Sequence, residues 1–154
     1  MIREILQYPD PGLRLLCSPL IEVSEDTKII IGDMFETMYA ANGRGLAGPQ
    51  IGFPYRVLVM DTAWKDGAPK PLEMINPEIL DKSEETQFNE ERCLSIAGEP
   101  IEVTRAKNIQ VMWLDQNGEQ FRRSFSDFSA ACICHEVDHL DGKLILDKLV
   151  MSSG

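Results

Sequence analysis

The chain has 154 residues, of which 44% are hydrophobic, and it carries a formal net charge of −10 at pH 7. This length fits a single domain over residues 1–154 with a sizeable core. An acidic chain without a Lys/Arg cluster is a poor candidate for binding nucleic acid directly, and no apolar run approaches the roughly 20 residues that span a membrane. The N-terminal stretch is too short and too charged for a signal peptide, so a cytoplasmic protein is expected.

The first third of the chain predicts an arm, a helix and a tight loop. Residues 1–23 are rich in turn-forming residues and are expected to be irregular. An apolar helical period predicts a helix over 27–41, with Ser24 or Asp26 as its cap. Residues 43–50 hold three glycines and a proline, so this backbone must bend tightly or lie close to another group.

The rest of the chain predicts strands and then one more helix. Alternating or short apolar runs predict extended segments at residues 56–61, 72–80, 84–95, 101–105, 109–114 and 119–122. Pro77 marks an edge or a bulge, and Asn117-Gly118 is a hairpin signal. A helix is expected from the cap Ser126 to about Leu140, with Gly142 as its stop. The expected fold class is α+β, with mostly antiparallel strands packed around this C-terminal helix.

This last helix carries His135-Glu136-Val137-Asp138-His139, which has the spacing of a metal site. Positions i and i+4 share a helix face, so His135 and His139 can hold one metal ion. Glu136 lies beside the pair and can act as general base on a water molecule activated there. The alternative is a chance match on an amphipathic helix. An apolar stripe on the histidine side opposes that alternative, because it would bury a histidine pair that then needs a partner.

A third ligand is needed, because a catalytic site of this kind usually takes three protein ligands and water. The chain has only two histidines, and no glutamate follows His139. Cys93 is the best remaining candidate, because its thiolate would complete a Cys, His, His and water site. Cys132 lies one turn before the first histidine and could line the site, whereas Cys134 should face away and Cys17 is expected to be a packing residue.

Three segments, in this order, resemble the signature motifs of the peptide deformylase family. They are Gly43-Arg44-Gly45-Leu46-Ala47-Gly48-Pro49-Gln50, Glu91-Arg92-Cys93-Leu94-Ser95 and His135-Glu136-Val137-Asp138-His139. The family shows Gly-Φ-Gly-Φ-Ala-Ala-x-Gln, Glu-Gly-Cys-Leu-Ser and His-Glu-Φ-Asp-His, where Φ is apolar, and the likeness covers nearly the whole chain. The resemblance implies a metal-dependent amidohydrolase that removes the N-formyl group from the formyl-methionine of nascent polypeptides and releases formate.

The resemblance also implies a role for each motif position. The residues implied to hold the metal are Cys93, His135 and His139. The ion is Fe(II) in the family, with Zn(II) or Ni(II) possible in a purified sample. Glu136 would move the proton, while the Gln50 side chain and the backbone N–H of Leu94 would donate to the oxyanion. Gly45 matches a position whose backbone pairs with the substrate.

The methionine side chain of the substrate is expected to enter an apolar pocket. The residues that would line this pocket are Phe128, Ala131 and Cys132, for which ordinary helix core is an equal alternative. Arg105 is expected to pair with Glu91 or Asp138 and so hold the cysteine strand against the helix.

Four positions depart from the family pattern. Arg44, Gly48, Arg92 and Asp127 stand where the family usually has an apolar residue, alanine, glycine and glycine. None of them removes a ligand, the base or an oxyanion donor. Arg44 and Arg92 flank the expected substrate groove, and we hypothesise that they favour acidic residues beyond the methionine. The alternative is that both are solvated surface arginines.

Two other functions stay open. A zincin-type peptidase shares the H-E-x-x-H helix but needs a downstream ligand that is missing here, and a repurposed relative would bind metal or peptide without turnover. The intact Glu136 and Gln50 argue against a mere binder, which needs neither. The expected partners are formyl-methionyl peptides, with a transient ribosome contact through a surface other than residues 147–154. The protein is expected to be a monomer.

Overall fold

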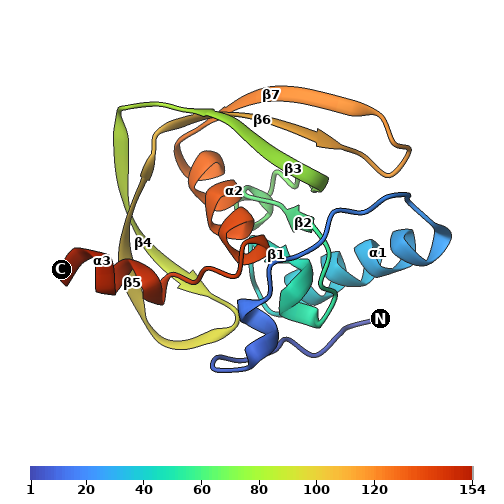
Figure 1. The fold of residues 1–154 in the computed structure, drawn as a ribbon, viewed down its shortest axis with the longest axis horizontal. Coiled ribbons are helices and arrows are strands. Elements are labelled where there is room, and N and C mark those ends of the chain that lie inside the picture. The colour runs from blue at the N-terminus through green and yellow to red at the C-terminus, as the bar shows by residue number, and fades with distance from the viewer. Residues whose placement is uncertain (154) are drawn as a thin grey trace.

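One helix, α2 (Asp127–Leu140), lies at the centre of the molecule with strands of two antiparallel sheets around it (Figure 1). The larger sheet has the order β1-β2-β3-β6-β7, and β4 pairs with β5 in the smaller one. This computed structural model describes residues 1–153, with the side chains described through residue 149. The predicted α+β class, with antiparallel strands around the C-terminal helix, is confirmed.

The predicted elements occur in the expected order with some bounds displaced, whereas the strand at Gly45–Ala47 and the helix at Leu146–Ser153 were not predicted. The strands are β1 (Gly45–Ala47), β2 (Val57–Met60), β3 (Leu72–Lys82), β4 (Thr86–Cys93), β5 (Ile96–Ala106), β6 (Asn108–Leu114) and β7 (Gln120–Ser126). The other helices are α1 (Glu25–Ala40) and α3 (Leu146–Ser153), and short 3-10 turns lie at Pro11–Arg14, Gly48–Ile51 and Trp64–Asp66. Residues 43–50, predicted to bend tightly, thus form a short strand followed by a 3-10 turn.

Helix α1 begins at the cap that the sequence offers. The Ser24 hydroxyl accepts a hydrogen bond from the backbone N–H of Thr27 at 3.2 Å, which satisfies one of the unpaired donors of the first turn. Ile31, Met34 and Met38 form its buried face and pack in one cluster with residues of β1 and β2. The helix therefore supports the edge of the sheet that carries the glycine-rich segment.

The irregularities predicted in the sheet are present. The register between β3 and β6 shifts between Ile75 and Glu78, so Pro77 lies in a bulge rather than in a regular ladder. Asn117 and Gly118 form the turn between β6 and β7, where the Asp115 carboxylate accepts the backbone N–H of Asn117 at 2.8 Å. These features confirm the hairpin and the proline prediction.

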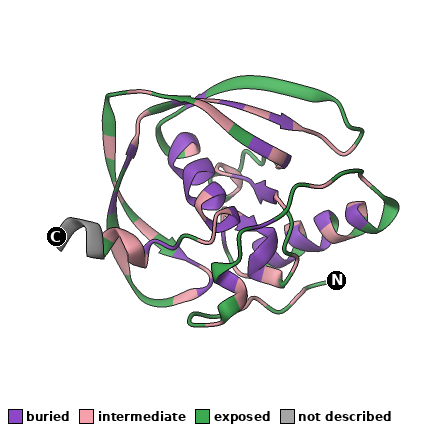
Figure 2. Ribbon diagram, viewed as in Figure 1, coloured by how far each residue is buried: buried purple, intermediate pink, exposed green. Residues whose placement is uncertain are grey.

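Helix α2 is buried over most of its surface (Figure 2). Ser126 occupies the predicted N-cap position, but its hydroxyl makes no capping hydrogen bond. Asp127 takes a positive φ of 55°, which turns the strand directly into the helix. After the helix, Gly142 has φ 72°, and an added Cβ there would meet Arg14 O at 2.5 Å. The predicted stop at Gly142 is therefore confirmed.

The N-terminal arm lies across the two segments that carry the first and second motifs. The backbone N–H of Leu6 donates to Gln50 O at 2.7 Å, and that of Tyr8 donates to Ser95 O at 2.8 Å. The side-chain amide of Gln7 donates to Leu94 O at 2.9 Å. The arm therefore ties the turn after β1 to the tip of the β4–β5 hairpin.

Within residues 1–153, no helix is long and apolar enough to cross a membrane.

Candidate metal and hydrolytic site

Cys93, at the end of β4, meets the two histidines of α2. The ligand atoms of Cys93, His135 and His139 all lie within 4.8 Å of one another, and all three residues are buried. Cys93 Sγ is 3.2 Å from Nε2 of His139. The centroids of the two imidazole rings are 5.2 Å apart, as expected for positions i and i+4 on one helix face. The three residues predicted as ligands are thus brought together.

Glu91 and Arg105 connect the cysteine strand to the histidine helix. Glu91 Oε1 lies 2.9 Å from Nδ1 of His135, and Arg105 donates to both oxygens of Glu91 at 3.0 and 2.8 Å. Arg105 also donates to Asp138 Oδ2 at 2.6 Å, so it pairs with both predicted partners rather than one. Burial alone would raise the pKa of Glu91, but these hydrogen bonds outweigh burial and lower it to about 2. Glu91 therefore stays ionised and fixes the ring of His135.

The electrostatics of the cluster favour a bound cation. Burial opposes protonation of His135, but the charge of Glu136 and hydrogen bonds to Cys93 and Glu91 outweigh burial and raise the pKa of this histidine. The pKa of His139 is lowered by burial and by the charge of His135. His139 Nδ1 is buried with no protein hydrogen-bond partner. A cysteine sulfur and two imidazole nitrogens that converge in this way are a ligand set that suits a transition-metal ion.

Glu136 faces the same centre as the ligands. Its side chain is buried, and Oε1 has no protein hydrogen-bond partner. Burial raises the pKa of Glu136 to about 7, although the charge of His135 opposes this. A carboxyl that titrates near neutrality can accept a proton and return it, which is what a general base requires.

Gly45 lies against Glu136 across the cleft. A Cβ added at Gly45 would overlap the Glu136 carboxylate and lie 3.0 Å from Cys132 Sγ. The sequence predicted a close approach in this segment, and this contact is its physical cause. Only a residue without a side chain leaves the backbone of β1 open to the cleft here.

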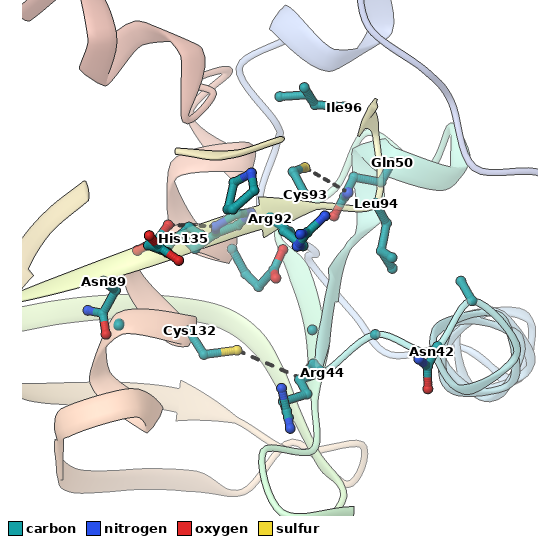
Figure 3. Close-up of a pocket in the computed structure, with 18 of the residues that line it drawn as sticks. Asn42, Arg44, Gln50, Asn89, Arg92, Cys93, Leu94, Ile96, Cys132 and His135 are labelled. Carbon is teal, nitrogen blue, oxygen red and sulfur yellow. Dashed lines mark hydrogen bonds and ion pairs between the residues drawn. The ribbon is translucent and has the colours of Figure 1, made fainter. Parts of the chain in front are cut away.

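Gln50 is held in place from both ends of its amide. Its Oε1 accepts the backbone N–H of Ala47 at 2.9 Å, and its Nε2 donates to Ser95 Oγ at 3.0 Å. The same Nε2 is 3.7 Å from Cys93 Sγ (Figure 3). The amide donor therefore points toward the ligand cluster, where an oxyanion donor would have to lie.

A cleft of about 820 Å³ opens over these residues. The helix residues Phe128, Ala131 and Cys132 line it, as do Leu94 and Arg92. Figure 3 shows Cys132 on the helix and Arg92 and Leu94 on the segment that carries Cys93. Ala131 and Cys132 are buried, whereas Phe128 keeps 47% of its surface exposed. Every residue that the sequence proposed for the site therefore borders the cleft or, like His139, lies directly beneath it.

The family model for polypeptide deformylase matches residues 2–153. The chain belongs to the polypeptide deformylase family. Members of this family are hydrolases that remove the N-formyl group from nascent polypeptides, and they depend on a metal ion. The expectation drawn from the three motifs is thus confirmed for family, enzyme class and reaction.

Individual relatives agree with the family match. A peptide deformylase from Alkalilimnicola ehrlichii is 47% identical over 148 residues, which cover 96% of this chain and 82% of the relative. One from Pseudothermotoga lettingae is 45% identical over 153 residues, covering 99% and 85%. The crystal structure of peptide deformylase from Thermotoga maritima superposes with a TM-score of 0.89 at 38% identity, covering 96% of this chain and 97% of that one.

Two departures from the deformylase motifs have a structural cause. A Cβ at Gly48 would lie 2.6 Å from Phe53 O, so the backbone has no room for the family's usual alanine. Asp127 has φ 55°, a conformation that glycine adopts freely and that aspartate tolerates better than most residues. At this position the backbone takes a conformation that glycine adopts freely, although the residue is an aspartate.

Some residues of the deformylase site were missed or underused in the sequence analysis. Ser95 was quoted only as part of a motif, yet its hydroxyl holds Gln50. Glu91 was expected only to pair with Arg105, yet it also orients His135. Its position two residues before Cys93, on one face of a strand, was the signal that could have shown this. Lys65 reaches the cleft from a loop that carries no motif.

Proposed function

We propose that this chain removes the formyl group from formyl-methionyl peptides with one divalent metal ion held by Cys93, His135 and His139. The observation that carries the proposal is the convergence of these ligands, Glu136 and Gln50 on one cleft. A binding protein without turnover would need neither a buried carboxyl with a pKa near neutrality nor a fixed amide donor. We further propose that residues 1–154 form a single catalytic domain.

The reaction is hydrolysis of the formyl amide. When bound, the metal ion supplies a Lewis acid that lowers the pKa of water and polarises the formyl carbonyl. The Glu136 carboxylate accepts the proton of the attacking water and returns it to the departing amine nitrogen. A new C–O bond forms and the C–N bond breaks, so the products are formate and a peptide with a free N-terminus.

Two donors receive the negative charge that develops on the formyl oxygen. One is Nε2 of Gln50, which Ser95 and Ala47 hold in one orientation. The other is the backbone N–H of Leu94, which follows the cysteine ligand in the turn between β4 and β5. Because these groups are positioned before the substrate arrives, they cost little reorganisation during the reaction.

The substrate would lie along β1 with its methionine side chain beside α2. Gly45 leaves its backbone open to pair with the peptide, and Phe128, Ala131 and Cys132 supply apolar surface for the methionine. A structure of the Acinetobacter baumannii peptide deformylase, described as bound to Met-Ala-Ser, has a TM-score of 0.88 to this chain at 32% identity, covering 96% and 98%. Met-Ala-Ser is the peptide that the proposed reaction would release from formyl-Met-Ala-Ser.

The identity of the metal ion, the cellular compartment and the oligomeric state are proposals as well. We propose Fe(II) as the native ion, with Zn(II) or Ni(II) able to replace it, since imidazole and thiolate ligands accept all three. We propose that the protein acts in the cytoplasm as a monomer and meets nascent chains through a transient contact with the ribosome.

Formate release from formyl-Met-Ala-Ser tests the proposal. Protein purified anaerobically with Fe(II) is expected to release formate, and Glu136→Gln is expected to lose about two to four orders of magnitude in rate while keeping its metal. Acetyl-Met-Ala-Ser is the control for a peptidase, because cleavage at a peptide bond would consume both peptides. Metal-loaded protein that releases no formate would contradict the proposal and favour a repurposed relative.

A further inference from the structure

Three cationic side chains line the cleft, and they come from different parts of the chain. They are Arg44, Lys65 and Arg92. Among the described side chains, none of these three forms an ion pair with a carboxylate. The charges of these three side chains are thus available in a chain that has 25 Asp and Glu against 15 Lys and Arg. Cations that pair with no carboxylate of the protein can pair with the anionic groups of a bound ligand.

Arg44 stacks over Phe128 at the methionine side of the cleft. Its guanidinium carbon lies 5.5 Å from the centroid of the Phe128 ring, a cation–π distance. Its Nε is buried without a hydrogen-bond partner. The residue directly precedes Gly45, where the substrate backbone is proposed to pair. A stacked arginine loses little side-chain freedom when it meets an anion, which makes it a suitable contact.

Lys65 lies close enough to Arg44 for the two charges to affect one another. The pKa of Lys65 is lowered by partial burial and by the charge of Arg44. Lys65 also lies 5.6 Å above the ring of Trp64, whose indole N–H donates to Gly43 O at 2.9 Å. Two like charges brought together beside the substrate strand repel each other, and an anion between them would relieve the repulsion.

Arg92 borders the cleft from the other proposed substrate wall, beside Cys93 (Figure 3). It is exposed and follows Glu91, so its side chain leaves the strand on the face opposite to the one that meets His135. Glu90 is an exposed acidic residue on the same rim, but no ion pair joins it to the three cations within residues 1–149. Both walls that flank the proposed path of the peptide therefore carry positive charge.

We propose that Arg44, Lys65 and Arg92 select formyl-methionyl peptides with acidic residues in the positions that follow the methionine. The inference rests on the proposed function, because the direction of the peptide comes from it. Positive charges on both sides of the path place an acidic side chain near a cation whether it points toward β1 or toward β4. Basic peptides meet the same cations as like charges and are disfavoured.

The size of the effect follows from the exposure of these groups. Exposed ion pairs are weak, so we expect kcat/KM for an acidic peptide to exceed that for its neutral isostere by about three- to tenfold at low salt. Screening should reduce this preference, because the Debye length falls from about 20–30 Å at low salt to a few Å near 1 M. Loss of the preference at high salt would show that it depends on the charge of the peptide and not on its shape.

The experiment measures formate release from peptides that differ only in charge. The set is formyl-Met-Glu-Ala, formyl-Met-Ala-Glu, and the versions with Gln or Lys in place of Glu, all with amidated C-termini. Wild type is compared with a triple Arg44→Gln, Lys65→Gln, Arg92→Gln variant. The readout is the ratio of kcat/KM for Glu and Gln peptides within each protein, which does not depend on the fraction of active enzyme.

A control variant removes one positive charge outside the cleft. Arg122 is exposed on β7, and Arg122→Gln is expected to leave both the activity and the ratio unchanged. The triple variant should bring the ratio to about one. If the loss of the Arg44–Phe128 stack prevents folding, the Lys65→Gln, Arg92→Gln double variant is expected to lower the ratio on its own.

The outcomes separate the two proposals. Formate release at equal rates from Glu, Gln and Lys peptides in the wild type would overturn the selectivity and leave the deformylase proposal standing. A preference for Glu that is undiminished in the triple or double variant would also overturn it. Release from none of the peptides by metal-loaded protein would overturn the proposed function and this inference together.

Discussion

Glu91 Oε1 lies 2.9 Å from Nδ1 of His135, so the strand that ends in the cysteine ligand also orients a histidine ligand. Partners of this kind fix the ring and strengthen the ligand, and their loss typically costs about 10- to 100-fold in metal affinity. We expect Glu91→Ala to lose affinity in this range, measured by competition with a chelator. Glu90→Ala, on the opposite face of β4, is the control and should bind metal normally. Equal affinities for the two variants would contradict this role.

Gln50 is expected to affect the rate directly, and Ser95 is expected to affect it through its hydrogen bond to Gln50. Gln50→Ala removes the proposed oxyanion donor and should lower kcat by about two to three orders of magnitude. Ser95→Ala removes only the hydroxyl that accepts from Gln50 Nε2, so a smaller loss in kcat with little change in KM is expected. Steady-state kinetics on formyl-Met-Ala-Ser distinguishes them. A larger loss in Ser95→Ala than in Gln50→Ala would show that the hydroxyl, and not the amide, meets the substrate.

Gly45 and Gly32 differ in the space around them. An added Cβ at Gly45 would overlap the Glu136 carboxylate, so Gly45→Ala is expected to abolish most of the formate release. Nothing lies within 4 Å of a Cβ added at Gly32 in α1. Gly32→Ala should therefore raise the unfolding free energy by about 0.5–1 kcal/mol and leave the activity unchanged. Thermal unfolding and formate assays on both variants check this, and an active Gly45→Ala enzyme would show that β1 can move.

The effect of substitutions at Asp127 on the unfolding free energy is expected to depend on how well the new residue tolerates a positive φ. Its φ of 55° suits glycine and penalises alanine. We expect Asp127→Ala to lower the unfolding free energy by about 1–2 kcal/mol, and Asp127→Gly to be less destabilising than Asp127→Ala. Urea unfolding of the two variants side by side gives the difference. Equal stabilities would mean that the aspartate side chain, and not its φ, determines this position.

Tyr39 should give the protein a pH-dependent stability at the alkaline end. Burial and the 2.6 Å hydrogen bond from its hydroxyl to Asp61 raise the pKa of Tyr39 to about 12, above its usual value of about 10. Because the folded pKa is the higher one, this contribution is complete below about pH 10 and is lost as pH rises toward about 12. Ultraviolet titration should resolve one late tyrosine, and Tyr39→Phe should remove it.

The metal ligands could be predicted because they follow local spacing or a motif. His135 and His139 are related by one helical turn, and Cys93 was the best donor left once the sequence offered no other ligand. The links that hold the site could not be predicted in the same way. Ser95 meets Gln50 across 45 positions and Glu91 meets His135 across 44, so each contact depends on how the strands are packed.

The missing capping bond at Ser126 has its origin in the backbone at Asp127. The sequence suggested a serine cap, since serine before an apolar period usually caps a helix. In the structure the strand β7 runs directly into α2, and the turn is made by the positive φ of Asp127 instead of by a side-chain bond. The preference of serine for helix caps does not reveal the backbone conformation where a strand continues directly into a helix.

Cys93 and His139 are 46 positions apart in the chain, yet their ligand atoms are 3.2 Å apart. An ion bound to both is a cross-link that closes a loop through the whole of β5, β6 and β7. By the loop-closure relation used for disulfides, a link across this distance is worth about 4 kcal/mol of unfolding free energy. Chelation should therefore do more than stop the reaction: it reopens the loop, and slow hydrogen exchange in the β4–β5 hairpin should become fast first.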